Sequence, residues 1–217
     1  MSEEIKVLKT GTTTVGIVCK DGIVMAADKR ASAGEGFIAD RRAKKIHKIL
    51  ENIYVTTAGV VSDVQLVIKL TKAELRLKEI RSRTRPTVKE ATNLFASIVY
   101  QNIRKFSPIL GITAFIVGGK DHEGFSLYEV GADGSVSDFK DYVTSGAYGS
   151  FIAYGILENE WNPNMTVNEG LKMAVKVINT AIKRDATVGD GIDVVVIDNK
   201  GATEMPEVKV NEILKAK

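Results

Sequence analysis

Apolar and polar residues along this chain follow two periods, one typical of strands and one typical of helices. Short apolar or β-branched runs predict strands over 12–19, 22–28, 45–49, 53–58, 112–118, 125–130, 136–142 and 192–198, and a last edge strand after the turn at 199–201 closes the chain. The turn Lys20-Asp21-Gly22 predicts that the first two runs form a hairpin. The small residues of Ala31–Gly36 indicate a loop.

Helical spacing appears in four segments, which occur in two adjacent pairs. Boxes of Ser or Thr followed three residues later by Gln or Glu predict helix starts at Ser62, Thr87 and Thr166. The first helix should end before Pro86, and the last should reach about Arg184. A further helix fits 149–160 and is ended by Asn162-Pro163.

The order of these elements is strands, two helices, strands, two helices and strands. Helices that arrive in pairs, rather than one per strand, argue against a doubly wound parallel sheet. The pattern therefore predicts an α+β fold, a four-layer αββα sandwich of two antiparallel sheets flanked by helix pairs. With no internal linker or repeat in the 217 residues, we expect a single domain over 12–217.

Composition narrows the possible functions. The hydrophobic fraction of 44%, the charged fraction of 26% and the net charge of +3 are those of an ordinary soluble protein, and predict neither a nucleic-acid nor a membrane partner. The single Cys19, with His47 and His122, provides no metal-ligand spacing, and no glycine-rich nucleotide loop is present, so we expect no cofactor. The N-terminus lacks an apolar signal region, which predicts a cytoplasmic protein.

The dipeptide Gly11-Thr12, at the start of the first predicted strand, could take part in a specific reaction. Cleavage between these residues would give Thr12 both a hydroxyl nucleophile and a free α-amine, whose pKa of about 7.7–8.0 suits a general base near neutral pH. Glycine leaves the carbonyl of this bond unshielded and permits a strained turn. Thr12, Thr13 and Thr14 are also simply good strand residues, so the motif alone leaves both interpretations open.

Other candidate groups lie near the ends of predicted elements. Asp28 ends an apolar strand, where a carboxylate is costly to bury unless it is paired. Lys44 and Lys45 begin another strand, Gly59 follows the next, and Asp185 lies near the end of the last helix. Each of these residues taken alone also has an ordinary structural explanation.

Together and in this order, these residues resemble the β subunits of the archaeal 20S proteasome, which are N-terminal nucleophile hydrolases. The resemblance runs from about Thr10 to about Met205, and five blocks carry it: GTTTVGI, AADKRA, AKKIHKI, TTAGVVSDVQ and KRDATVGDGIDVVVI. The fold that the resemblance implies agrees with the αββα sandwich predicted from the order of the elements.

The resemblance implies a role for each candidate residue. Thr12 matches the nucleophile that autocatalytic removal of residues 1–11 exposes. Asp28 and Lys45, rather than Lys44, match the acid and the lysine of the catalytic centre. Gly59 matches the backbone donor to the oxyanion, and Asp185 the acid that supports the threonine amine. The positions that line the substrate channel correspond to Ser32, Thr57 and Val61.

Two positions depart from the family pattern. Tyr148 and Val188 stand where serines are usual, and both serines belong to the shell that moves protons to the amine. The leading hypothesis is a threonine endopeptidase in a heptameric β ring, stacked on an α-subunit ring through which a regulatory ATPase feeds unfolded proteins. The alternatives are a catalytically silent or conditionally active structural β subunit that needs a partner β subunit, and a different N-terminal nucleophile amidase.

Overall fold

In the described part of the chain the strands form two five-stranded sheets and one small hairpin, and every strand pair there is antiparallel. The structure is a computed structural model that describes residues 11–33, 37–107, 110–146 and 148–215. The first sheet consists, in spatial order, of β10 (Tyr142–Gly146), β1 (Thr13–Cys19), β2 (Gly22–Asp28), β11 (Ile192–Asp198) and β12 (Gly201–Glu204). The second consists of β5 (Ile46–Leu50), β6 (Ile53–Gly59), β7 (Thr113–Asp121), β8 (Gly124–Val130) and β9 (Val136–Phe139).

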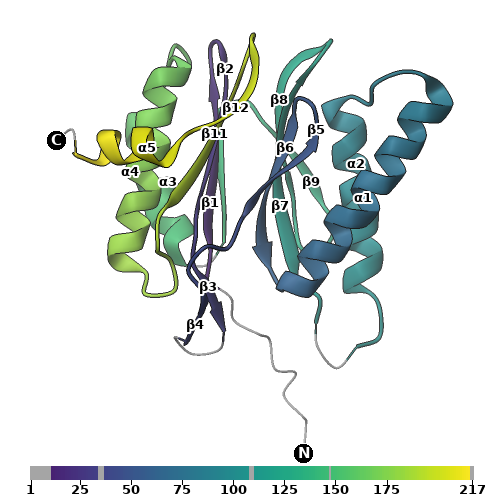
Figure 1. The fold of residues 1–217 in the computed structure, drawn as a ribbon, viewed down its shortest axis with the longest axis horizontal. Helices are drawn as coiled ribbons and strands as arrows, with labels where there is room; N and C mark the ends of the chain where they lie inside the picture. The colour runs from purple at the N-terminus through teal and green to yellow at the C-terminus, as the bar shows by residue number, and fades with distance from the viewer. Residues whose placement is uncertain (1–10, 34–36, 108–109, 147, 216–217) are drawn as a thin grey trace, which may run out of the picture.

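Helices cover the outer face of each sheet (Figure 1). The first sheet is covered by α3 (Tyr148–Glu160) and α4 (Val167–Arg184), with α5 (Glu207–Lys215) beside them. The second is covered by α1 (Val61–Ser82) and α2 (Val88–Ile103). The sheets face one another between these helix layers, so the predicted four-layer αββα sandwich is confirmed.

Alternation along the strands builds three apolar layers, because successive side chains point to opposite faces of a sheet. In β2, Val24 and Ala26 pack against the α4 side, whereas Ile23 and Met25 belong to the layer between the sheets. A third layer lies between the second sheet and α1 and α2, around Phe95. Both faces of the central strands are therefore buried, which explains why these strands read as continuous apolar runs.

Two loop and strand predictions were wrong in part. Ala31–Gly36 is not simply a loop, because β3 (Ala31–Ala33) pairs with β4 (Phe37–Asp40); residues 34–36 lie outside the described part of the chain. The single strand predicted over 136–142 is two strands. β9 pairs with β8, and the chain then crosses to the other sheet, where β10 pairs with β1.

Helix ends show two further differences. The boxes at Thr87 and Thr166 are confirmed, with both reciprocal hydrogen bonds formed. The box predicted at Ser62 is wrong: the N-cap is Val60, which makes no side-chain capping bond, and the Ser62 hydroxyl donates to Asp63 instead. The edge strand predicted near the C-terminus exists as β12, but the chain continues into α5, whose Val210 is buried.

Candidate active site

Strand pairing places Thr12 and Asp28 at the same end of the first sheet. β1 and β2 are antiparallel, and Thr14 lies opposite Ala27, so the residue that begins β1 lies beside the residue that ends β2. The backbone N–H of Thr13 donates to Asp28 Oδ1 at 3.1 Å. Thr12 itself is buried, with only 5% of its surface exposed. The hairpin thus fixes the predicted nucleophile against the predicted acid.

Asp28 and Lys45 form a buried ion pair, in which Lys45 Nζ lies 2.8 Å from Asp28 Oδ1. The carboxylate is 0% exposed, and its other oxygen accepts backbone N–H groups of Arg30 and Gly189, each at 3.1 Å. Charge pairing and several hydrogen bonds compensate the loss of hydration that burial imposes. Burial lowers the pKa of Lys45, and the charge and hydrogen bond of Asp28 oppose that shift.

The carbonyl oxygen of Gly11 is the point on which two donors converge. The Thr12 hydroxyl donates to this oxygen at 2.7 Å, and Lys45 Nζ donates to it at 3.4 Å. The hydroxyl is therefore in contact with the peptide group that self-cleavage would break, and a cationic donor faces the oxygen where negative charge would develop. Residues 1–10 lie outside the described part of the chain, but the bond between Gly11 and Thr12 is inside it.

A cavity of about 110 Å³ opens on the Gly11-Thr12 bond. Its walls come from the two residues before β1, from β3, β5 and β6, from the segment before β5, and from the start of α1, and they contain the three predicted substrate positions, which are Ser32, Thr57 and Val61. Gly59 also lines the cavity; its φ of +118° lies in the region that favours glycine, and a methyl group there would come within 2.1 Å of the Ile112 carbonyl oxygen. The structure therefore brings Gly59 and the substrate positions to the same cavity as Thr12.

Asp185 is buried at the end of α4 and does not line this cavity. It is the C-cap residue of α4, and its Oδ1 accepts the backbone N–H and the hydroxyl of Thr187 at 2.9 and 2.6 Å. Its Oδ2 accepts the backbone N–H of Gly149, at the start of α3, at 3.1 Å. Asp185 thus connects the end of α4 to the start of α3 on the helix side of Thr12.

Thr187 is a site residue that the sequence analysis missed. A methyl group at Gly11 would come within 2.0 Å of Thr187 Cβ, so Thr187 packs directly against the residue before the predicted cleavage point. The Ser32 hydroxyl donates to the Thr187 carbonyl oxygen at 2.9 Å. The only signal in the sequence was an Asp followed two residues later by Thr, a spacing at which the Asp side chain can accept the backbone N–H.

The two residues that depart from the family pattern do not add a hydroxyl to the helix side of the site. The Tyr148 side chain is directed outward, since 71% of the residue is exposed. Val188 is buried and apolar, and its backbone N–H donates to the Asp185 carbonyl oxygen. The hydroxyl groups described around Asp185 therefore come from residues other than Tyr148 and Val188.

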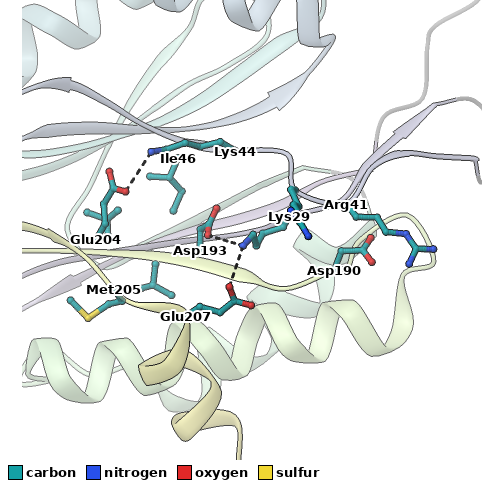
Figure 2. Close-up of a pocket in the computed structure, with 12 residues that line it drawn as sticks. Lys29, Arg41, Lys44, Ile46, Asp190, Asp193, Glu204, Met205 and Glu207 are labelled. Atoms are coloured by element: carbon teal, nitrogen blue, oxygen red, sulfur yellow. Dashed lines mark hydrogen bonds and ion pairs between the residues drawn. The ribbon is translucent and has the colours of Figure 1, made fainter.

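A larger groove, of about 660 Å³, lies along β11 and β12 at the edge of the first sheet but carries different chemistry. Figure 2 shows its charged walls, where Lys44 reaches Glu204 and Lys29 lies between Asp193 and Glu207. These are paired, partly exposed charges, and among the described residues neither a threonine nor a cysteine lines the groove. The smaller cavity at Thr12 is therefore the candidate active site.

Other kinds of chemistry find less support in the described part of the chain. Burial raises the pKa of the Cys19 thiol to about 12, so this side chain is not a thiolate nucleophile at neutral pH. Among residues 11–33, 37–107, 110–146 and 148–215, no group of three His, Cys, Asp or Glu side chains is arranged to hold a metal ion. No helix within those ranges has the length and apolar character needed to cross a membrane.

Comparison with known proteins agrees with this geometry. The family described as "Proteasome subunit" matches residues 8–197. The proteasome subunit beta of Archaeoglobus profundus is 44% identical over 204 residues, which cover 94% of this chain and 92% of that protein. The proteasome subunit beta of Ferroglobus placidus is 43% identical over 96% of each chain, and the proteasome subunit beta 1 of Thermococcus sibiricus is 39% identical over 94% and 95%.

The αββα sandwich, with a threonine at the start of a central strand beside a buried Asp–Lys pair, defines the class of N-terminal nucleophile hydrolases. The similarity extends over nearly the whole chain and includes both sheets and the four long helices. The chain belongs to the proteasome family, as a β subunit of the core particle. Assembly with other subunits into that core follows from this membership.

Proposed function

We propose that this β subunit is a threonine endopeptidase that exposes its own nucleophile by cleaving the bond between Gly11 and Thr12, which removes residues 1–11 as a propeptide and leaves 12–217 as the mature domain. One observation carries the proposal: the buried Thr12 hydroxyl and the buried Lys45 Nζ both donate to the Gly11 carbonyl oxygen at the wall of the cavity. A threonine that served only as a strand residue would need neither a buried lysine nor a cavity at its preceding peptide bond.

Self-cleavage begins when Thr12 Oγ attacks the Gly11 carbonyl carbon. The hydroxyl proton leaves through a water molecule, a bond forms between Oγ and the carbon, and Lys45 stabilises the negative charge on the Gly11 oxygen. The bond between carbon and the Thr12 nitrogen then breaks, and the nitrogen takes up a proton to become a free amine. Water hydrolyses the resulting ester, which releases the leader carboxylate and restores the hydroxyl.

Substrate cleavage repeats this chemistry with a new base. The free Thr12 amine removes the hydroxyl proton as Oγ attacks the substrate carbonyl, and returns that proton to the departing amine of the product. Asp28 holds Lys45 charged and oriented near the hydroxyl. A backbone N–H from Gly59 directed at the oxyanion would lower the barrier by about 3 kcal/mol. The methyl group of Thr12 restricts its χ1 and keeps the hydroxyl aimed.

The proposal includes the setting in which this subunit works. Family membership supports a heptameric ring of β subunits beneath a ring of α subunits, a regulatory ATPase that acts through the α ring, unfolded proteins as substrates, and a cytoplasmic location. Ser32, Thr57 and Val61 would contact the substrate side chain that enters the cavity. On α1, Arg76 and Lys78 pair with Glu79 and Glu90, which supports a solvated or subunit-facing surface rather than a nucleic-acid track.

The intact mass of the subunit in fully assembled particles tests the proposal. We expect the mass of residues 12–217 from the wild-type chain and the full mass from Thr12→Ala, while Thr12→Ser, which keeps a hydroxyl, should still lose the leader. Loss of the leader from Thr12→Ala would show trimming by another subunit. Retention of Met1–Gly11 in assembled wild-type particles would contradict self-processing and favour the structural, conditionally active β subunit that needs a partner.

A further inference from the structure

The hydroxyl of Thr13, directly after the nucleophile, is buried without a hydrogen-bond partner. Thr13 is 0% exposed, and among the described residues its Oγ1 is one of three buried side-chain oxygens in this condition. The other two belong to Thr71 in α1 and Thr113 in β7. Such groups are rare in folded proteins and call for an explanation.

Thr13 points to the opposite face of β1 from Thr12 and Thr14, toward the start of α3. A methyl group at Gly149 would come within 1.9 Å of Thr13 Oγ1, so the hydroxyl lies directly over this glycine. The backbone N–H of Gly149 donates to Asp185 Oδ2. Asp185 Oδ1 in turn accepts the hydroxyl of Thr187, which packs against Gly11. These contacts connect the Thr13 hydroxyl, through Gly149 and Asp185, to the bond that self-cleavage breaks.

The hydroxyl is not needed to fill space. Valine has the same branched outline and also favours strands, whereas a buried hydroxyl with no partner destabilises a fold by about 1–3 kcal/mol. Thr13 Oγ1 and Asp185 Oδ2 are both polar and both border Gly149, so a water molecule held between them would satisfy the hydroxyl. The residues at 148 and 188, which carry serines in the family pattern, supply no competing hydroxyl here.

We propose that Thr13 is a positioning residue of this active site: with Asp185 it holds a water molecule that accepts a hydrogen bond from the Thr12 α-ammonium and carries its proton away. The inference rests on the proposed function, since that amine exists only after cleavage. The ammonium loses one proton to the water, which passes it to solvent, and the neutral amine then serves as the base for the Thr12 hydroxyl.

The charged groups around the start of β1 are Asp28 at the end of β2, Lys45 before β5, Asp185 after α4, and the Arg30 guanidinium bound to Asp190. The Tyr148 phenol, at the start of α3, is directed outward. Substitution of Thr13 leaves all of them in place. Without the water that accepts its hydrogen bond, the Thr12 ammonium is less stable relative to the neutral amine, so its pKa falls. The acidic limb of the pH–rate profile should therefore move to lower pH.

The test compares Thr13→Val with Thr13→Ser in the full chain, assembled into particles. We expect Thr13→Val to lower peptidase kcat/KM by on the order of tenfold and to move the acidic limb of its pH profile to lower pH, while Thr13→Ser restores both. Thr71→Val removes another buried, unpartnered hydroxyl far along α1 and provides the matched control, which should leave rate and profile unchanged.

The outcomes separate this inference from the proposed function. Wild-type particles that keep the leader would overturn both. Wild-type particles that lose it, with Thr13→Val matching them in rate and pH profile, would overturn the positioning role alone. If Thr13→Val does not assemble, Thr13→Ala replaces it, because alanine removes the hydroxyl without adding a methyl group; equal profiles for Thr13→Ala and Thr13→Ser would then overturn the inference.

Discussion

Two adjacent lysines of this chain enter opposite environments. Lys45 is 7% exposed and pairs with the fully buried Asp28, whereas Lys44 is 57% exposed and pairs with the half-exposed Glu204 across the charged groove of Figure 2. Alternation along the extended segment before β5 sends one side chain inward and the other outward. The same chemical group thus lies in a buried ion pair at the candidate active site in one position and is a weakly coupled surface charge in the next.

Burial explains why the two pairs should differ in consequence. An exposed pair is screened by water and contributes little, whereas removal of one partner from a buried pair leaves an uncompensated charge. The Asp28 carboxylate also accepts backbone N–H groups of Thr13, Arg30 and Gly189, whereas within the described residues the Glu204 carboxylate accepts only from the Lys44 side chain. The comparison predicts large effects at Lys45 and Asp28 and small effects at Lys44 and Glu204.

The largest difference should appear in peptidase activity. We expect Lys45→Met to lower kcat/KM of assembled particles by roughly 10³–10⁴-fold, because the cation that faces the oxyanion and the nucleophile is lost. Lys44→Met should stay within about threefold of wild type, as its side chain is solvated. Thermal melts and particle assembly would show whether each variant is folded. Similar losses of kcat/KM in the two variants would contradict the predicted difference between Lys45 and Lys44.

The second largest difference should appear between Asp28 and Glu204, in the free energy of unfolding of variants at these two positions. Asp28→Asn should destabilise the precursor by about 3–5 kcal/mol, because it leaves Lys45 buried without a counter-charge and turns an amide toward N–H donors. Glu204→Gln should change the free energy of unfolding by less than about 0.5 kcal/mol. Urea denaturation of the two variants and wild type measures both values. A loss for Asp28→Asn no larger than for Glu204→Gln would contradict the assigned role of burial.

The third prediction concerns the packing of Gly11 and the rate at which the leader, residues 1–11, is removed. Gly11→Ala would place a methyl group within 2.0 Å of Thr187, so the scissile carbonyl must shift away from Thr12 Oγ and Lys45. We expect loss of the leader to slow by roughly 100-fold, since displacements of about 1 Å commonly have that effect. Mass spectrometry during assembly follows the rate. Gly155→Ala is the control, because nothing lies within 4 Å of its new methyl group; equal rates for both variants would argue against the contact.

Residues at strand ends could be predicted from the sequence, and residues brought together by tertiary packing could not. Thr12 and Asp28 flank a hairpin whose pairing the Asp21-Gly22 turn already indicates, so their proximity follows from local pattern. The contacts of Thr187 with Gly11 and of Thr13 with Gly149 depend instead on tertiary packing, which places the end of α4 beside the start of α3. No periodicity within either segment shows that approach.

The errors in the fold have similar causes. β9 and β10 both have the alternation of strands, and nothing in that alternation shows that the chain changes sheets between Phe139 and Tyr142. The helix α5 is short and is stabilised by packing of Val210, Ile213 and Leu214 on the core beneath it rather than by its own propensity. Ser62 fits a capping pattern, but the backbone begins the helix at Val61.

The smallest predicted effect concerns how the charge of the exposed Lys44 acts on the pKa of His47 in the cavity. His47 lines the cavity, and its pKa is lowered from 6.5 first by burial and then by the charges of Lys72 and Lys44. The folded state therefore binds fewer protons than the unfolded state below pH 6.5, and the free energy of unfolding falls as the pH falls through that range. Lys44→Met removes one of the opposing charges, so the pKa of His47 should rise and this loss of stability should become smaller.

Histidine NMR titration of the folded precursor measures this shift, because the chain contains only His47 and His122 and the His47→Gln variant assigns the two signals. A Glu204→Gln variant supplies the opposite perturbation: the Glu204 charge raises the pKa of His47, so its removal should lower that pKa further. Opposite shifts in the two variants would show that the charges of the exposed pair act on the pKa of His47 through their electric field. An unchanged His47 titration in both would mean that solvent screens Lys44 completely, and that only Lys45 of the adjacent pair acts on the site.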